Sequence, residues 1–133
     1  MTGIRLSGAI VPAMRDFRGL LVWQKSHALA LAVRRQTRSF PRRGYASFIS
    51  QLIRAAESIP FNIVEGCGAA SQKDFARYLD NSIKSANELE YQLQLALDNN
   101  ILSKRRWKAL TDDCIEVRKM LYGLRRKVLR DMS

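Results

Sequence analysis

Clusters of basic residues are the feature of this sequence with the most definite chemistry. Lys104, Arg105 and Arg106 are consecutive, and further arginines flank a Phe-Pro pair at residues 40–41. Ammonium and guanidinium groups bind phosphate oxygens, and arginine often does so through two parallel hydrogen bonds. The candidate nucleic-acid-binding residues are Arg34, Arg35, Arg38, Arg42, Arg43, Lys104, Arg105, Arg106 and Lys108.

The position of Lys104–Arg106 favours a bound anion over a structural role. Ser103 has the residue type of a helix N-cap, so these cations would occupy the first turn of a helix. Positive charge there opposes the helix dipole and costs about 0.3–1 kcal/mol per residue. A phosphate ligand would explain such a cluster, and an ordinary solvated face is the alternative.

The charge of the whole chain is concentrated in its two ends. The 133 residues carry 23 Lys plus Arg and 12 Asp plus Glu, a formal net charge of +11. Residues 1–40 hold seven basic and one acidic residue, and residues 103–133 hold ten and four. An excess of this size points to a polyanionic partner, most often nucleic acid, because phosphate contacts dominate such binding.

Most enzymatic chemistry is excluded by composition. His27 is the single histidine, and no CxxC, HExxH, GxGxxG or GxxxxGKS pattern occurs. We therefore expect no catalytic residues, no metal and no cofactor. The two cysteines, Cys67 and Cys114, are expected to be free thiols in a reducing cytoplasm. No apolar run approaches the ~20 residues of a membrane span, so no membrane partner is expected.

Four segments with helical periodicity position the cations. They cover about residues 21–39, 46–66, 71–98 and 103–130, separated by short turns rich in Gly, Pro or Asn. Short connections favour antiparallel neighbours, so the expected fold is all-α, an up-and-down bundle of four long helices over residues 16–131. Residues 1–15 fit no amphipathic pattern and are expected to be a loose tail, with Met1 or Met14 as the true start.

This topology would gather the nine cations at one end of the bundle. In an up-and-down bundle the first and fourth helices are antiparallel neighbours. The end of the segment 21–39 and the turn that follows it would then share one pole with the start of the segment 103–130. Arg15, Arg18, Arg125, Arg126, Lys127 and Arg130 would gather at the opposite pole.

A stripe of hydrogen-bonding side chains runs along the second helical segment. Its members are spaced by three or four residues and therefore lie on one face. One interpretation is the solvated face of an amphipathic helix; the other is an ordered polar seam or a subunit interface, since the side chains are short and geometrically definite. The stripe consists of Gln51, Arg54, Ser58, Asn62 and Glu65, with Ser47 at its start.

Three segments carry a recognisable family pattern. They are residues 17–25 (FRGLLVWQK), residues 40–41 (FP) and residues 51–66 (QLIRAAESIPFNIVEG). Together they resemble the four-helix-bundle family encoded in intervening sequences of bacterial 23S rRNA genes. The resemblance covers about residues 16–126. Arg42 and Arg43 depart from it, because an acidic residue commonly follows the Phe-Pro in that family.

The resemblance implies an antiparallel four-helix bundle that assembles as a homopentamer and has no established catalytic activity. The family also looks related to the accessory proteins of diversity-generating retroelements, which bind nucleic acid and a reverse transcriptase. The stripe coincides with the family signature, which favours its interpretation as an ordered seam or interface.

Two hypotheses for function follow. The first is a non-enzymatic, cytoplasmic homo-oligomer that binds nucleic acid, RNA favoured, through phosphate contacts at its basic poles. The second is a protein-interaction adaptor or scaffold, for example for a reverse transcriptase, in which contact with nucleic acid is secondary.

Overall fold

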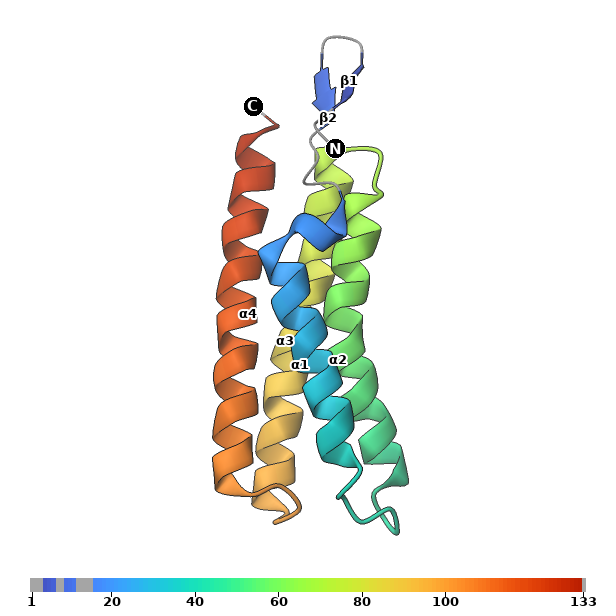
Figure 1. Cartoon of the computed structure of the whole chain (residues 1–133), viewed down its shortest axis with the longest axis vertical. Coiled ribbons are helices and arrows are strands. Elements are labelled where there is room, and N and C mark those ends of the chain that lie inside the picture. Colours follow the sequence, from blue (N-terminus) through green and yellow to red (C-terminus); the bar gives the residue numbers. More distant parts are fainter. Residues whose placement is uncertain (1–3, 7–8, 12–15, 133) are drawn as a thin grey trace.

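The computed structural model describes residues 4–6, 9–11 and 16–132, and its main body is a bundle of four long helices (Figure 1). A 3-10 turn, η2 (Phe17–Gly19), leads into α1 (Leu21–Thr37). The other helices are α2 (Ala46–Cys67), α3 (Gln72–Asp98) and α4 (Lys104–Arg130). The predicted all-α bundle is confirmed, and the helices begin and end within about two residues of the predicted positions.

Two short strands precede the bundle. β1 (Ile4–Leu6) and β2 (Ala9–Val11) pair antiparallel, with Ile4 opposite Val11. The sequence pattern did not indicate this pairing. The other residues of the predicted loose tail, 1–3, 7–8 and 12–15, lie outside the described residues, and so does Arg15 of the second predicted pole.

Local sequence signals set the helix ends. The hydroxyls of Ser71 and Ser103 cap α3 and α4 by accepting hydrogen bonds from the backbone N–H of Asp74 and Arg106. Asn100 follows α3 with a φ of 62°, the left-handed conformation that asparagine tolerates better than most residues. These are the caps and the stop that the sequence predicts, and they keep the α3–α4 turn short.

Apolar stripes on the four helices meet along the bundle axis. Every member of the α3 seam, from Phe75 to Ala96 at spacings of three and four, is buried, and Cys114, Val117 and Leu121 of α4 face it. Burying apolar surface contributes about 25 cal/mol per Å². Burial of the four stripes is therefore the main source of bundle stability. The largest fully buried side chains are Phe75, Leu52, Ile59, Ile63, Leu79, Leu89, Leu93 and Leu121.

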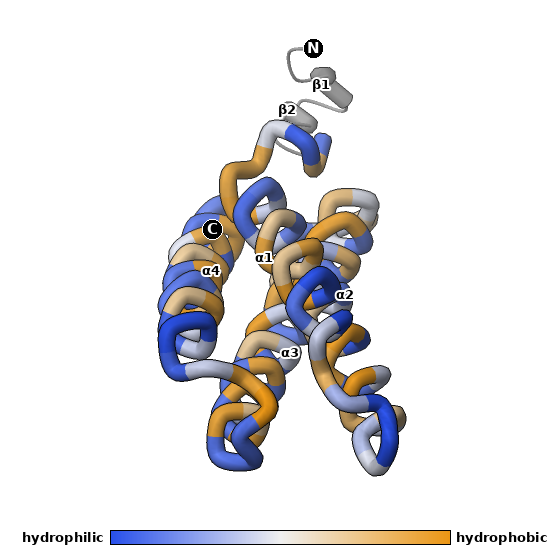
Figure 2. Tube along the Cα trace, turned by 60° about the horizontal axis from the view of Figure 1, so that its bottom comes forward, coloured by the Kyte–Doolittle hydropathy of each residue, from blue (hydrophilic) through white to orange (hydrophobic). Residues whose placement is uncertain are grey.

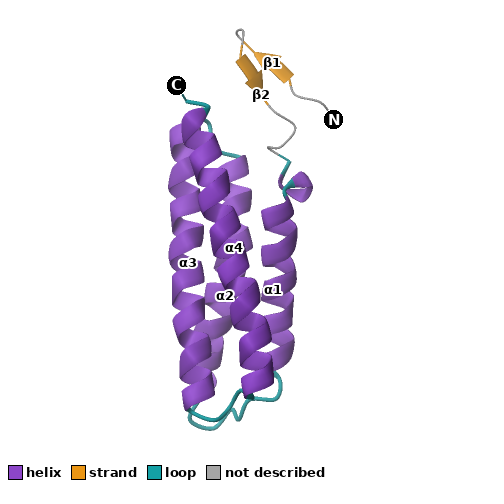
Figure 3. Cartoon of the chain, turned by 90° about the vertical axis from the view of Figure 1, so that its left-hand side faces the viewer, coloured by secondary structure: helices purple, strands orange, loops and turns teal. Residues whose placement is uncertain are grey.

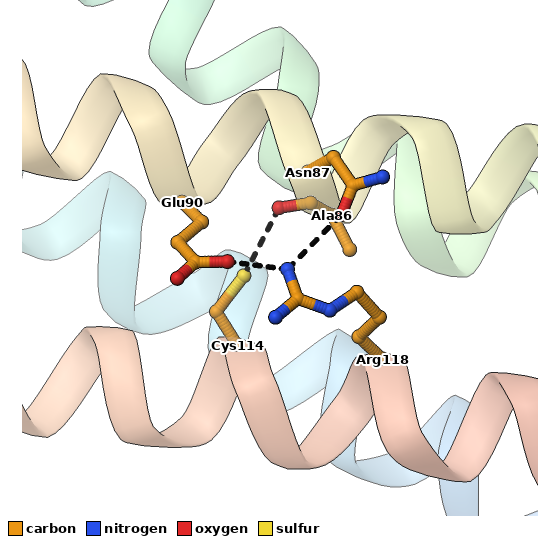
Figure 4. A network of polar contacts seen from close by, with 5 residues as sticks. All are labelled: Ala86, Asn87, Glu90, Cys114 and Arg118. Carbon is orange, nitrogen blue, oxygen red and sulfur yellow. Dashed lines mark hydrogen bonds and ion pairs between the residues drawn. The ribbon is translucent and has the colours of Figure 1, made fainter.

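Polar contacts join α3 to α4 beside the core (Figure 4). Arg118 bonds to Glu90 and, at 3.0 Å, to the side-chain oxygen of Asn87. The Cys114 thiol donates to the Ala86 carbonyl at 3.3 Å. Burial raises the pKa of this thiol from 9.0 to about 12; Glu90 adds to the rise and Arg118 partly offsets it. Cys114 is therefore a protonated packing residue rather than a nucleophile.

A polar seam joins α2 to α3. The hydroxyls of Ser58 and Ser85 are 2.7 Å apart, and Asn62 donates to the Ser58 carbonyl at 2.9 Å and to its hydroxyl at 3.0 Å. One turn further into the core, Ser82 donates to the Ile59 carbonyl at 2.8 Å. The Ser58–Ser85 and Ser82–Ile59 bonds fix the axial stagger of the two helices, and the Asn62 bonds within α2 hold the Ser58 side chain in place.

Gly66 allows the end of α2 to approach the start of α3. A Cβ atom at this position would lie 2.7 Å from Cδ1 of the buried Phe75 ring and 3.2 Å from Cβ of Tyr78. Gly123 of α4 is different, because a Cβ there would meet only the end of the Arg126 side chain at 3.8 Å. The two helical glycines therefore make a matched pair.

We expect Gly66→Ala to destabilise the bundle by about 1–3 kcal/mol, because the added methyl overpacks against Phe75. Gly123→Ala is expected to stabilise it by about 0.5–1 kcal/mol, the usual gain of helix propensity. Urea unfolding followed by circular dichroism measures both. Equal effects of the same sign would contradict the close approach at Gly66.

The polar seam predicts a second difference in stability. Asn62→Leu removes two hydrogen bonds at a half-buried position and is expected to cost about 0.5–1.5 kcal/mol. Arg54→Ala, on the same helix but exposed, is expected to change stability by less than about 0.5 kcal/mol. The same unfolding experiment measures both variants. If Asn62→Leu leaves the free energy of unfolding unchanged, this part of the stripe is a solvated face rather than an ordered seam.

Candidate nucleic-acid interface

The predicted basic pole lies at one end of the bundle. The α1–α2 and α3–α4 turns are both at the end remote from the strands (Figures 1 and 3). The end of α1 and the start of α4 therefore meet there. Figure 2 brings this end forward and shows hydrophilic segments in the α1–α2 turn and at the start of α4.

Two open grooves at this end place the arginines side by side. The first, about 460 Å³, lies between α1 and α4 and is lined by Arg35, Arg38 and Arg106. The second, about 430 Å³, lies between α1 and α2 and is lined by Arg34, Arg38 and Arg42. Arg38 belongs to both grooves, so it links them across the end of α1.

Two of the nine predicted cations are neutralised by nearby carboxylates. Arg34 pairs with Glu57 of α2 at 3.0 Å, and Lys108 pairs with Asp112 one turn further along α4 at 2.8 Å. Both pairs are exposed and of small energetic value. They leave less charge for a ligand than the sequence suggested. Within the described part of the chain the other seven make no ion pair: Arg35, Arg38, Arg42, Arg43, Lys104, Arg105 and Arg106.

The first turn of α4 is electropositive in both its side chains and its backbone. It holds Lys104, Arg105 and Arg106 and no acidic residue. The unpaired N–H groups of a helix N-terminus carry a partial positive charge of about half an elementary charge. Arg105 and Arg106 are exposed, and neither is held by a carboxylate among residues 16–132. This arrangement can bind an anion without first breaking an ion pair.

The opposite pole keeps less of its charge available. Arg18 pairs with Asp16 at 3.7 Å, and Arg125 pairs with Asp80 of α3 at 2.5 Å. Arg126, Lys127 and Arg130 make no ion pair within the described residues. These three lie in or near the last turns of α4, where the helix dipole makes positive charge favourable.

The helix 2 stripe divides into two parts. Ser58 and Asn62 are half-buried and belong to the α2–α3 seam. Gln51, Arg54 and Glu65 are exposed. Ser58 and Asn62 thus face α3, while the other three residues lie on the outer surface of the single chain, where the subunit interface stays a prediction.

Sequence reasoning missed three residues of these surfaces. Gln36 and Ser39 line the α1–α4 groove among the arginines. Phe61 is 63% exposed and lies within about 20° of Arg54 on the α2 helical wheel. A large apolar residue among the polar members of the stripe was the signal that could have revealed it.

The described residues form neither a metal-binding cluster nor a membrane-spanning helix. No group of three or more His, Cys, Asp or Glu side chains comes together there in a way that could hold a metal ion. None of the helices described is both long and apolar enough to cross a membrane.

Comparison with known proteins identifies the fold family. Residues 18–123 match the family described as 23S rRNA-intervening sequence protein. A crystal structure of a protein of unknown function from the S23 ribosomal protein family of Bacteroides thetaiotaomicron VPI-5482 is 27% identical, with a TM-score of 0.73. The similarity covers 80% of this chain and 96% of that one. No curated protein matches significantly. The chain therefore belongs to the 23S rRNA-intervening sequence protein family.

Proposed function

We propose that this chain is a non-enzymatic, basic, homo-oligomeric protein that binds nucleic acid, with RNA the favoured ligand, through phosphate contacts at the α1–α4 pole. The carrying observation is the group of seven cations at this end that make no ion pair among the described residues. Three of them occupy the start of α4, where they oppose the helix dipole. A bound polyanion offsets that cost.

Distribution of the carboxylates supports the same proposal. Three acidic residues form ion pairs between helices, and all three pairs are remote from the start of α4. These residues are Asp80, Glu90 and Glu116. Near the pole, Glu57 and Asp112 neutralise only Arg34 and Lys108, and Asp98 accepts a hydrogen bond from Gln94. Seven cations are thus left to contact phosphates, with a steep dependence of affinity on salt.

Charge reversal at the start of α4 tests the proposal. We expect Arg105→Glu with Arg106→Glu to weaken RNA binding at least tenfold at 100 mM salt and to lower the slope of log K against log salt by about 2. Fluorescence anisotropy with a labelled RNA hairpin over a salt series measures both quantities.

The matched control is Arg126→Glu with Lys127→Glu, which changes the net charge equally at the opposite pole. We expect it to weaken binding much less. Equal losses in the two double variants would show that net charge alone attracts the RNA. Binding that does not vary with salt would contradict the proposal, and recovery of one protein partner after nuclease treatment would favour the adaptor hypothesis.

The exposed edge of the α2 stripe supports the homo-oligomer in the proposal, and the family resemblance implies five subunits. Phe61 lies exposed beside Arg54 and Glu65. A central aromatic residue among polar groups is typical of subunit interfaces.

We expect light scattering to give about five times the 15.2 kDa chain mass, and Phe61→Ser to lower that mass. Tyr91→Ser is the control, because Tyr91 of α3 is equally exposed at 63%. A wild-type monomer at micromolar concentration would contradict the oligomer. Equal loss of mass in both variants would place the interface elsewhere.

A further inference from the structure

The α1–α4 groove combines cations at its rim with apolar surface at its base. Arg35, Arg38 and Arg106 are exposed, whereas Leu110 is buried and Ala32 is half-buried. The groove is open to solvent and has a volume of about 460 Å³. A site that bound phosphate alone would need the cations but not the apolar base.

Two small residues line this groove, one from each helix. They are Ala32 of α1 and Ala109 of α4. Gln36 and Ser39 add an amide and a hydroxyl to the same wall. The Gln36 side chain donates to the Ser39 hydroxyl at 3.4 Å, which orients the amide within the groove.

Two carboxylates further along the α1–α4 seam limit where a phosphate can lie. A third groove, of about 320 Å³, lies further along α1 and α4. It shares Ala32 and Arg35 with the α1–α4 groove and is also lined by Lys25, Asp113 and Glu116. Lys25 is paired with Glu116 at 2.9 Å. A phosphate chain running up the bundle would meet these carboxylates. The favourable direction is across the pole, from Arg106 past Arg38 to Arg42 in the α1–α2 groove.

We propose that the α1–α4 groove binds an unpaired nucleotide of a single-stranded segment. The guanidinium groups contact its phosphate, and the ribose and base lie on the methyl groups of Ala32 and Ala109. A duplex cannot occupy the groove in this way, because its bases are stacked and paired inside the helix, whereas unpaired bases can turn outward. This inference rests on the proposed function and adds a preference for single strands at the same pole.

Filling the groove without changing its charge tests the inference. We expect Ala109→Leu to weaken binding of a labelled eight-nucleotide single-stranded RNA about tenfold, because the larger side chain occupies the space of the bound nucleotide and overpacks against it. Binding of a blunt RNA duplex is expected to change by less than twofold. Fluorescence anisotropy at one fixed salt concentration measures both affinities.

Ala28→Leu is the matched control, since Ala28 is also exposed but lines the neighbouring groove that contains Asp113 and Glu116. We expect wild-type affinity for both RNAs from this variant. Melting temperatures of the two variants close to that of the wild type exclude unfolding as the cause of a loss in binding.

A second measurement uses a single nucleotide in place of RNA. Titration with adenosine 5′-monophosphate, followed by NMR of the backbone amides, is expected to shift Gln36, Ser39 and Ala109. Inorganic phosphate is expected to bind the same residues at least tenfold more weakly. Equal affinity for the two ligands would overturn the inference and leave a plain phosphate site.

The remaining outcomes separate the inference from the proposed function. If Ala109→Leu binds both RNAs as the wild type does, or if the wild type prefers the duplex, the inference is wrong and the proposed function stands. If neither RNA binds in a salt-dependent way, the proposed function fails and the inference fails with it.

Discussion

Each long helix must bury one apolar stripe, and this requirement sets the arrangement of the whole bundle. α2, α3 and α4 are each 22 to 27 residues long and joined by short turns, so their stripes can be covered only by antiparallel neighbours. That packing places the C-terminus of α1 and the N-terminus of α4 at the same end of the bundle (Figure 3). The basic pole is a consequence of this burial, because no direct attraction brings like charges together.

Ion pairs between helices add to the stability that packing supplies. Cross-helix pairs such as Arg118 with Glu90 and Arg125 with Asp80 use charge to tie α4 to α3 along the sides of the bundle. At the α1–α4 pole the carboxylates are too few to neutralise the arginines. The same bundle therefore has sides where charge stabilises the fold and one end where charge is available to a ligand.

Gly66 and the Ser58–Asn62 pair show how the family signature is related to packing. Gly66 removes a side chain where α2 comes closest to Phe75, and Ser58 and Asn62 supply hydrogen bonds where α2 meets α3. The exposed members of the same helix, such as Arg54 and Phe61, do not contribute to this packing. One segment of sequence thus serves the interior of the bundle and its outer surface at once.

The helices, their caps and the end of the bundle at which the cations gather could all be predicted from the sequence. These features depend on periodicity, capping residues and turn length, which are local. The sequence could not show that Arg34 meets Glu57 or that Ser58 meets Ser85, because such contacts depend on the stagger of neighbouring helices. The grooves around Arg38 likewise depend on how closely α1 approaches α4 and α2. Only the tertiary structure decided which cations remain available, since neutralisation depends on distances between side chains far apart in the chain.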